Sequence, residues 1–225
     1  MLFTEKIRKR AAPIWAQSMR HPFIKELQKG TLAEDKFRFY LIQDYFYLQA
    51  FAEIHRTAAD STEDLEIKKL FLQNIAGIER SEISVRETFF AELSITEEEI
   101  RQTDMAPNTY HYISHLYRAA YSGSVGQMVS ALLPCYWLYQ EIGDALIAEG
   151  SPHSLYQRWI ETYESEGYKL TVEAQKNLTN QLAEAASEEE QQLMEETFVI
   201  SSYEELYFWE MSYQKEEWSN KYVSL

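Results

Sequence analysis

The feature that most restricts the fold of this chain is how rarely its sequence is interrupted. Its 225 residues include only seven glycines and five prolines, so few positions suit tight turns or extended linkers. Apolar residues recur at helical spacing along most of the chain, and no alternation of period two runs longer than four residues. We therefore predict an all-α fold, a single-domain helical bundle that spans residues 1–225.

Helix boundaries follow from capping patterns and breakers. Three segments resemble capping boxes: Thr31-Leu32-Ala33-Glu34, Thr96-Glu97-Glu98-Glu99 and Ser187-Glu188-Glu189-Glu190. Turns are marked by Gly30, Pro107 and Pro152. The expected helices cover residues 4–19, a short piece at 23–27, 34–58, 61–93, a short piece after 96, 109–121, 124–147, 153–161, 168–186 and 188–218. Within 61–93, Glu79, Arg80 and Glu82 are expected on the solvated side.

Charge and cysteine content exclude several classes of function. The net charge is −15, which repels phosphate backbones and anionic lipids, so we expect no nucleic-acid or membrane partner. No run of 18 apolar residues and no signal-peptide pattern occurs. A single cysteine cannot form an intrachain disulfide, so a reducing cytoplasm is the expected location.

Three polar residues stand on otherwise apolar helical stripes. Asp44 lies among the aromatic residues of 34–58, Cys135 lies in the middle of 124–147, and Glu205 lies on the inward stripe of the last helix. A carboxylate is costly to bury unless something binds it. A structural carboxylate and a cysteine that acts as a small buried hydrophobe remain alternatives, and Glu204 lies on a neighbouring strip.

Two buried carboxyl groups near a thiol suit acid/base-assisted nucleophilic catalysis. No Lys, Arg or His is adjacent to Cys135, so its activating group must come from another helix. Ser-His-Asp, phosphate-loop and zinc patterns are absent, and His111 and His115 lack a second ligand pair, so no metal site is predicted. The 16 tyrosines favour a pocket for a flat polar ligand.

The chain resembles the TenA/thiaminase II family of aminopyrimidine aminohydrolases, in its cysteine-containing branch. The resemblance rests on segments spread over nearly the full length: His21-Pro22-Phe23, Gln43-Asp44-Tyr45-Phe46-Tyr47-Leu48, Leu133-Pro134-Cys135-Tyr136-Trp137-Leu138-Tyr139, Trp159-Ile160-Glu161-Thr162-Tyr163 and Ser201-Ser202-Tyr203-Glu204-Glu205-Leu206-Tyr207-Phe208-Trp209. It implies a haem-oxygenase-like bundle. It also implies hydrolysis of 4-amino-5-aminomethyl-2-methylpyrimidine to the hydroxymethyl pyrimidine, a thiamine-salvage step, and cleavage of thiamine to the same pyrimidine and a thiazole alcohol.

The same resemblance implies a role for each site residue. Cys135 would be the nucleophile, Glu205 the proton donor and acceptor, and Asp44 the ligand of the 4-amino group and ring nitrogen. The implied partners of the substrate are Tyr47 near the thiol and Tyr112, Tyr139 and Tyr163 around the ring, with Tyr110 an alternative to Tyr112. The chemistry needs no metal or organic cofactor, and the family is typically homotetrameric.

Two other readings use the same fold. Haem-binding and di-iron proteins share it, and a haem ligand would be a histidine on an apolar stripe, such as His55 or His115. Neither reading uses Asp44, Cys135 and Glu205. A non-catalytic pyrimidine-binding or regulatory protein is the remaining alternative.

Overall fold

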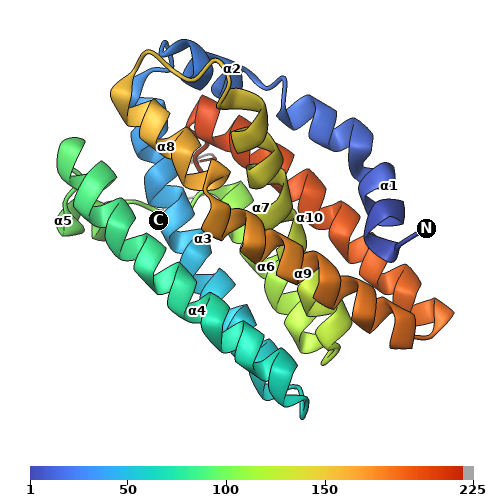
Figure 1. Cartoon of the computed structure of the whole chain (residues 1–225). Helices are drawn as coiled ribbons and strands as arrows, with labels where there is room; N and C mark the ends of the chain where they lie inside the picture. The colour runs from blue at the N-terminus through green and yellow to red at the C-terminus, as the bar shows by residue number, and fades with distance from the viewer. Residues whose placement is uncertain (220–225) are drawn as a thin grey trace.

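One helix runs through the middle of the bundle and most of the others pack around it (Figure 1). The computed structural model describes residues 1–219, and residues 220–225 lie outside the described part. The helices are α1 Phe3–Ser18, α2 Pro22–Lys29, α3 Glu34–Asp60, α4 Leu65–Val85, a π-helical turn η1 Arg86–Phe90, α5 Glu97–Gln102, α6 Pro107–Tyr121, α7 Val125–Leu146, α8 Ser154–Glu164, α9 Glu166–Ala185 and α10 Glu188–Gln214. Helix α7 is the central one, in contact with α3, α6, α8, α9 and α10.

No strand occurs within residues 1–219, which confirms the all-α prediction. The buried apolar residues form one continuous core. Helices α1 and α4 lie on opposite sides of this core (Figure 1). None of the described helices combines the length and the apolarity that crossing a bilayer requires.

Side-chain caps account for several helix starts. The hydroxyl oxygens of Thr96, Ser124 and Ser187 accept hydrogen bonds from backbone N–H groups in the first turns of α5, α7 and α10. The predicted Thr31 capping box is wrong, because Ala33 is the N-cap of α3. Residues 30–32 instead end α2: Gly30 adopts a φ of 70° and the Thr31 N–H donates to the Glu26 carbonyl oxygen at 2.9 Å.

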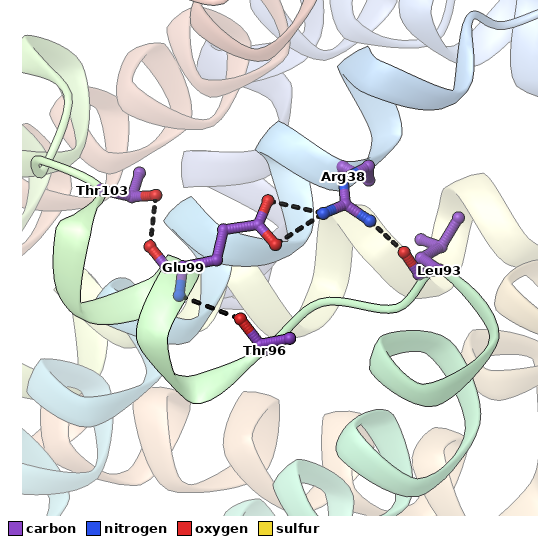
Figure 2. A network of polar contacts seen from close by, with 5 residues as sticks. All are labelled: Arg38, Leu93, Thr96, Glu99 and Thr103. Carbon is purple, nitrogen blue, oxygen red and sulfur yellow. Dashed lines mark hydrogen bonds and ion pairs between the residues drawn. The ribbon is translucent and has the colours of Figure 1, made fainter.

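The helix predicted over 61–93 starts later, at Leu65, and contains a π turn before it ends at residue 92. Helix α4 stops at Val85, and η1 follows. Arg38 on α3 fixes the next connection: its guanidinium donates to both Glu99 carboxylate oxygens, at 2.5 and 2.6 Å, and to the Leu93 carbonyl oxygen (Figure 2). Thr96 and Thr103 bond the Glu99 backbone from either side (Figure 2). The network therefore ties the segment after α4 to α3.

The last helix is also shorter than predicted. It ends at Gln214 rather than near Trp218, because Lys215 adopts the left-handed conformation with a φ of 51°. Trp218 then turns back, and its indole N–H donates to the Met105 carbonyl oxygen at 2.8 Å. Helix α9 starts two residues earlier than the predicted 168, at Glu166, so Gly167 lies inside it.

Two buried polar contacts orient the helices that carry the polar residues of the apolar stripes. The Trp15 indole N–H donates to Ser202 Oγ at 2.9 Å and joins α1 to α10. Gln43, fully buried on α3, donates to the Asp104 carbonyl oxygen at 3.0 Å and accepts from the Ala106 N–H at 2.9 Å. Because Gln43 directly precedes Asp44, these two hydrogen bonds hold the start of α6 next to the turn of helix α3 that carries Asp44.

Candidate active site

A cavity of about 770 Å³ opens between α4 on one side and α8 and α9 on the other, with α3 and α7 at its base. Four of the residues that the sequence singled out line it: Asp44, Cys135, Tyr139 and Tyr163. The others, Tyr47, Tyr112 and Glu205, lie in the layer of side chains behind Cys135. The structure therefore brings the predicted residues together from α3, α6, α7, α8 and α10.

Asp44 reaches the cavity from α3. It forms no ion pair or hydrogen bond with the described residues, and solvent reaches it only in part. Burial raises the pKa of this carboxyl group to about 7. The group therefore has capacity for a hydrogen-bonding ligand and changes its charge near neutral pH.

Cys135 lies on α7 with its thiol in the cavity wall. Burial raises the pKa of the thiol well above its usual value and nearby Glu205 adds to the rise, while the Tyr47 hydroxyl opposes it. The resting thiol is therefore neutral at pH 7, and becomes a nucleophile only when a base accepts its proton. Tyr168 on α9 donates to the Cys135 carbonyl oxygen at 3.5 Å.

Glu205 projects from α10 into the layer behind the thiol and is 2% exposed. Tyr112 Oη donates to Glu205 Oε1 at 2.8 Å. Burial raises the pKa of Glu205 to about 8. The nearby Asp44 carboxyl group adds to this rise, and the hydrogen bond from Tyr112 opposes it. Tyr110 is 58% exposed, so Tyr112 is the tyrosine of this pair that reaches the site.

Tyr47 stands between these groups. Its ring centroid is 4.7 Å from that of Tyr112, and its buried hydroxyl has no hydrogen-bond partner among the described residues. The hydroxyl faces the Cys135 thiol and the Tyr112 hydroxyl. A row of ionisable side chains thus leads from the cavity to a buried carboxyl group, in the order Cys135, Tyr47, Tyr112 and Glu205.

Aromatic rings form the wall of the cavity on the α8 side. The ring centroids of Tyr139 and Tyr163 are 4.9 Å apart, and Trp159 lies 4.8 Å from Tyr163. The Trp159 indole N–H is buried without a partner among the described residues. Such a wall is apolar on its faces and polar at its edges, which suits a flat heteroaromatic ligand.

Glu204, the neighbour of Glu205, has a separate partner. It is 2% exposed, and one of its carboxylate oxygens lies 2.8 Å from His111 Nδ1 at the surface. Burial raises the pKa of Glu204 and His111 opposes the rise. Because Glu204 faces His111 rather than the thiol, the row of ionisable side chains behind Cys135 ends at Glu205.

Two further tyrosines line the cavity that the sequence did not single out, Tyr136 and Tyr168. Tyr136 Oη donates to His55 Nε2 at 2.9 Å, and His55 Nδ1 donates to the Phe51 carbonyl oxygen at 2.7 Å. Burial lowers the pKa of His55 to about 4, so the ring is neutral. The only sequence signal for Tyr136 was its position next to Cys135.

The histidines considered as haem or metal ligands have other partners. Both ring nitrogens of His55 are hydrogen-bonded, and His115 Nε2 lies 3.0 Å from Ser201 Oγ. Within residues 1–219, no group of three or more His, Cys, Asp and Glu side chains is arranged to hold a metal ion. The groups available for catalysis are the Cys135 thiol and the Asp44 and Glu205 carboxyl groups, which titrate near neutral pH.

The chain is similar to known proteins over nearly its full length. The model of the TENA/THI-4/PQQC family matches residues 8–215. An aminopyrimidine aminohydrolase of Bacillus subtilis is 40% identical over 99% of this chain and 94% of that protein. A TenA homologue from P. horikoshii OT3 superposes with a TM-score of 0.87 at 25% identity, over 95% of this chain and 99% of that one.

Proteins of much lower sequence identity share the same fold. A domain of unknown function with a haem-oxygenase-like fold, from Shewanella denitrificans OS217, superposes with a TM-score of 0.73 at 14% identity over 98% of both chains. The predicted haem-oxygenase-like bundle is thereby confirmed.

Proposed function

The chain belongs to the TENA/THI-4/PQQC family, as its resemblance to TenA/thiaminase II proteins predicted, and we propose that it is an aminopyrimidine aminohydrolase. Its reaction replaces the amino group on the exocyclic methylene of 4-amino-5-aminomethyl-2-methylpyrimidine with the hydroxyl of water and releases ammonia. The observation that carries the proposal is that one cavity presents an unpartnered carboxyl group, Asp44, and a thiol, Cys135, with a buried carboxyl group behind the thiol.

The cavity suits binding of an aminopyrimidine. The Asp44 carboxylate accepts from the 4-amino group, and in its protonated form the same side chain donates to the adjacent ring nitrogen. With a pKa of about 7, Asp44 exchanges between these forms at neutral pH. The rings of Tyr139 and Tyr163 lie against the faces and edges of the pyrimidine.

Catalysis starts with removal of the thiol proton. The Cys135 proton passes to the Glu205 carboxylate, with Tyr47 and Tyr112 stabilising the thiolate and the carboxyl. The thiolate adds to the electron-poor pyrimidine ring, and electrons from the ring expel the amine at the exocyclic methylene as the Glu205 proton moves to it. Water then adds at the methylene, gives its proton to Glu205, and the thiolate leaves to restore the aromatic ring.

The same bond changes at carbon cleave thiamine, with the thiazole as leaving group in place of ammonia. The thiazolium leaves as the neutral thiazole and takes no proton, so Glu205 releases its proton to solvent before water adds. We expect both activities, and the ratio of their kcat/KM values identifies the preferred substrate. Purified protein is given each compound, and the hydroxymethyl pyrimidine is quantified by chromatography. Formation from the aminopyrimidine supports the proposal, and formation from thiamine alone would contradict it. Binding of both without product would instead indicate a non-catalytic pyrimidine-binding protein.

Asp44→Ala should raise the Michaelis constant for the aminopyrimidine about tenfold to a hundredfold, because a charge-assisted hydrogen bond in a cavity contributes about 1.5–3 kcal/mol. Steady-state kinetics measures this directly. Glu53→Ala, which removes an exposed carboxylate farther along α3, is the matched control and should leave the constant unchanged. An unchanged Michaelis constant in Asp44→Ala would remove its assigned role.

We propose that the protein assembles as a homotetramer. We also propose that it is located in the cytoplasm, where a free thiol stays reduced. An aromatic face on the neighbouring helices α6 and α10 supports the tetramer, with Tyr110, Tyr117, Tyr121, Tyr203 and Tyr207 each at least 42% exposed. Exposed apolar patches of this kind commonly mark protein contacts.

Light scattering on the native protein should give the mass of four chains. Tyr203→Glu with Tyr207→Glu should reduce that mass, because two charges would be buried in the contact. Leu72→Glu, a change at an exposed residue of α4 outside this face, is the control. A native monomer would contradict the tetramer and leave the enzymatic proposal intact.

A further inference from the structure

The cavity has an outer part that the proposed reaction of the small aminopyrimidine leaves unused. A stripe of α4 forms one wall of it: Gln73, Asn74, Gly77, Arg80 and Ser81 all line the cavity. The opposite wall comes from α9, through Leu170, Thr171 and Ala174. The α4 side of the cavity mixes these polar residues and the one cation, Arg80, with Leu70, Ile78 and Val85, whereas the wall around Tyr139 and Tyr163 is aromatic.

Asn74 is the first sign of a ligand at this wall. The residue is 7% exposed, and its side chain forms no hydrogen bond with the described residues. A buried carboxamide without partners destabilises a fold, so such groups are uncommon in proteins. A ligand in the cavity could supply the missing partner, because rotation of the amide presents either its nitrogen or its oxygen to the cavity.

Arg80 is the second sign. Arg80 and Glu79 are exposed, as predicted for the solvated side of α4, and the side chain of Glu82 lies outside the described residues. Arg80 also lines the cavity. Although acidic residues outnumber basic ones by 36 to 21, Arg80 forms no ion pair or hydrogen bond with the described residues. An unpaired guanidinium in so acidic a protein is available to an anion.

Gly77 leaves room between these two side chains. A Cβ atom there would meet only one described atom within 4 Å, the Arg80 Nη2 at 3.9 Å, so packing within the protein does not require glycine. Glycine inside a helix is less stable than alanine. The position is therefore explained better by the space it leaves on the cavity side than by the packing of α4.

From these residues we infer a second subsite, in which Arg80 and Asn74 bind the anionic end, a phosphate or a carboxylate, of a leaving group longer than ammonia. This inference rests on the proposed function, because the pyrimidine ring at Asp44 and Cys135 sets where the leaving group points. Arg80 would form charge-assisted hydrogen bonds to the anion and Asn74 would donate from the buried side. The enzyme would then prefer aminopyrimidines whose 5-methylene substituent ends in an anion.

The test is binding of three forms of thiamine to the Cys135→Ser protein, which prevents cleavage during calorimetric titration. The three forms end in the free hydroxyl, a phosphate monoester, or a carboxylate made by oxidising the hydroxyl. We expect at least one anionic form to bind about fivefold more tightly than the hydroxyl form at low salt, and the gain to shrink as salt rises. The stronger of the two anionic forms identifies the source of the anion.

Variants on α4 separate the subsite from general electrostatics. Arg80→Gln should abolish the preference, while Lys69→Gln, which removes an exposed cation of the same helix outside the cavity, should keep it. Asn74→Leu should reduce the preference without lowering the melting temperature, because the amide has no partner to lose. A purely structural role for Asn74 would instead lower the melting temperature.

Equal binding of the three forms, or a preference that survives in Arg80→Gln, would overturn the inference. Ammonia release from the aminopyrimidine by the native protein is measured in parallel. Release without an anion preference refutes the subsite alone, whereas absence of release refutes the proposed function.

Discussion

Cys135→Ser should leave a folded protein whose kcat for the aminopyrimidine is lower by about a thousandfold or more. Serine fits the same space, but its hydroxyl loses a proton far less readily than a thiol, and none of the described residues that line the cavity is a histidine that could serve as a base. The pKa of Cys135 is itself raised by burial, so the native enzyme depends on substrate and the carboxyl groups to form the thiolate.

Ammonia release in the steady state measures this loss, and far-ultraviolet circular dichroism checks the fold. Ser130→Ala is a matched control, because it removes a buried hydroxyl from the same helix outside the cavity and should keep the native rate. Native turnover in Cys135→Ser would remove the thiol from the mechanism and leave Asp44 and Glu205 as acid and base around a bound water.

Glu205→Gln should separate activity from stability. Turnover should fall about a hundredfold to ten-thousandfold, because the amide cannot carry the proton between thiol, leaving group and water. The same change should stabilise the fold at alkaline pH by about 1–3 kcal/mol, because it removes a buried charge while Tyr112 can still donate to the amide oxygen.

The pH dependence of that stabilisation has a definite sign. Burial raises the pKa of Glu205 from 4.5 to about 8, so the folded protein binds its proton more tightly than the unfolded chain does. Glu205 should therefore lower the stability of the native protein as pH rises from about 4.5 to about 8. Glu205→Gln should lack this contribution and keep only the loss due to Asp44, whose pKa burial also raises. Chemical denaturation of both proteins at pH 5 and pH 9 measures the difference.

Glu196→Gln, an exposed change on the same helix, is the control and should alter neither activity nor stability. Equal stability of Glu205→Gln and the native protein at pH 9 would contradict the raised pKa. Full activity in Glu205→Gln would contradict its role in proton transfer.

Helical periodicity was enough to predict the inward-facing residues at the centre of the candidate site. Asp44, Cys135 and Glu205 each interrupt an apolar stripe, and a stripe on a long helix must face the interior. Gln43 and Trp15 then determine how those helices are placed against their neighbours, through contacts between residues far apart in the chain. The sequence therefore predicted which side chains point inward and did not predict which of them meet.

The residues that sequence reasoning missed depend on packing between helices. Tyr136 and Tyr168 are two tyrosines among 16, and only the contacts with His55 and with the Cys135 carbonyl distinguish them. Arg80 follows the polar pattern of a solvated face, but the gap between α4 and α9 turns that face into a cavity wall. The connection after the π turn likewise depends on the contacts of Arg38 with Leu93 and Glu99, which come from a distant helix.

The most direct test of the proposed activity is the conversion of 4-amino-5-aminomethyl-2-methylpyrimidine by the purified native protein, with ammonia and the hydroxymethyl pyrimidine quantified in the same sample. We expect the two products to appear in equal amounts, at a rate proportional to the protein concentration. Folded protein that binds the aminopyrimidine in the cavity and releases neither product would contradict it.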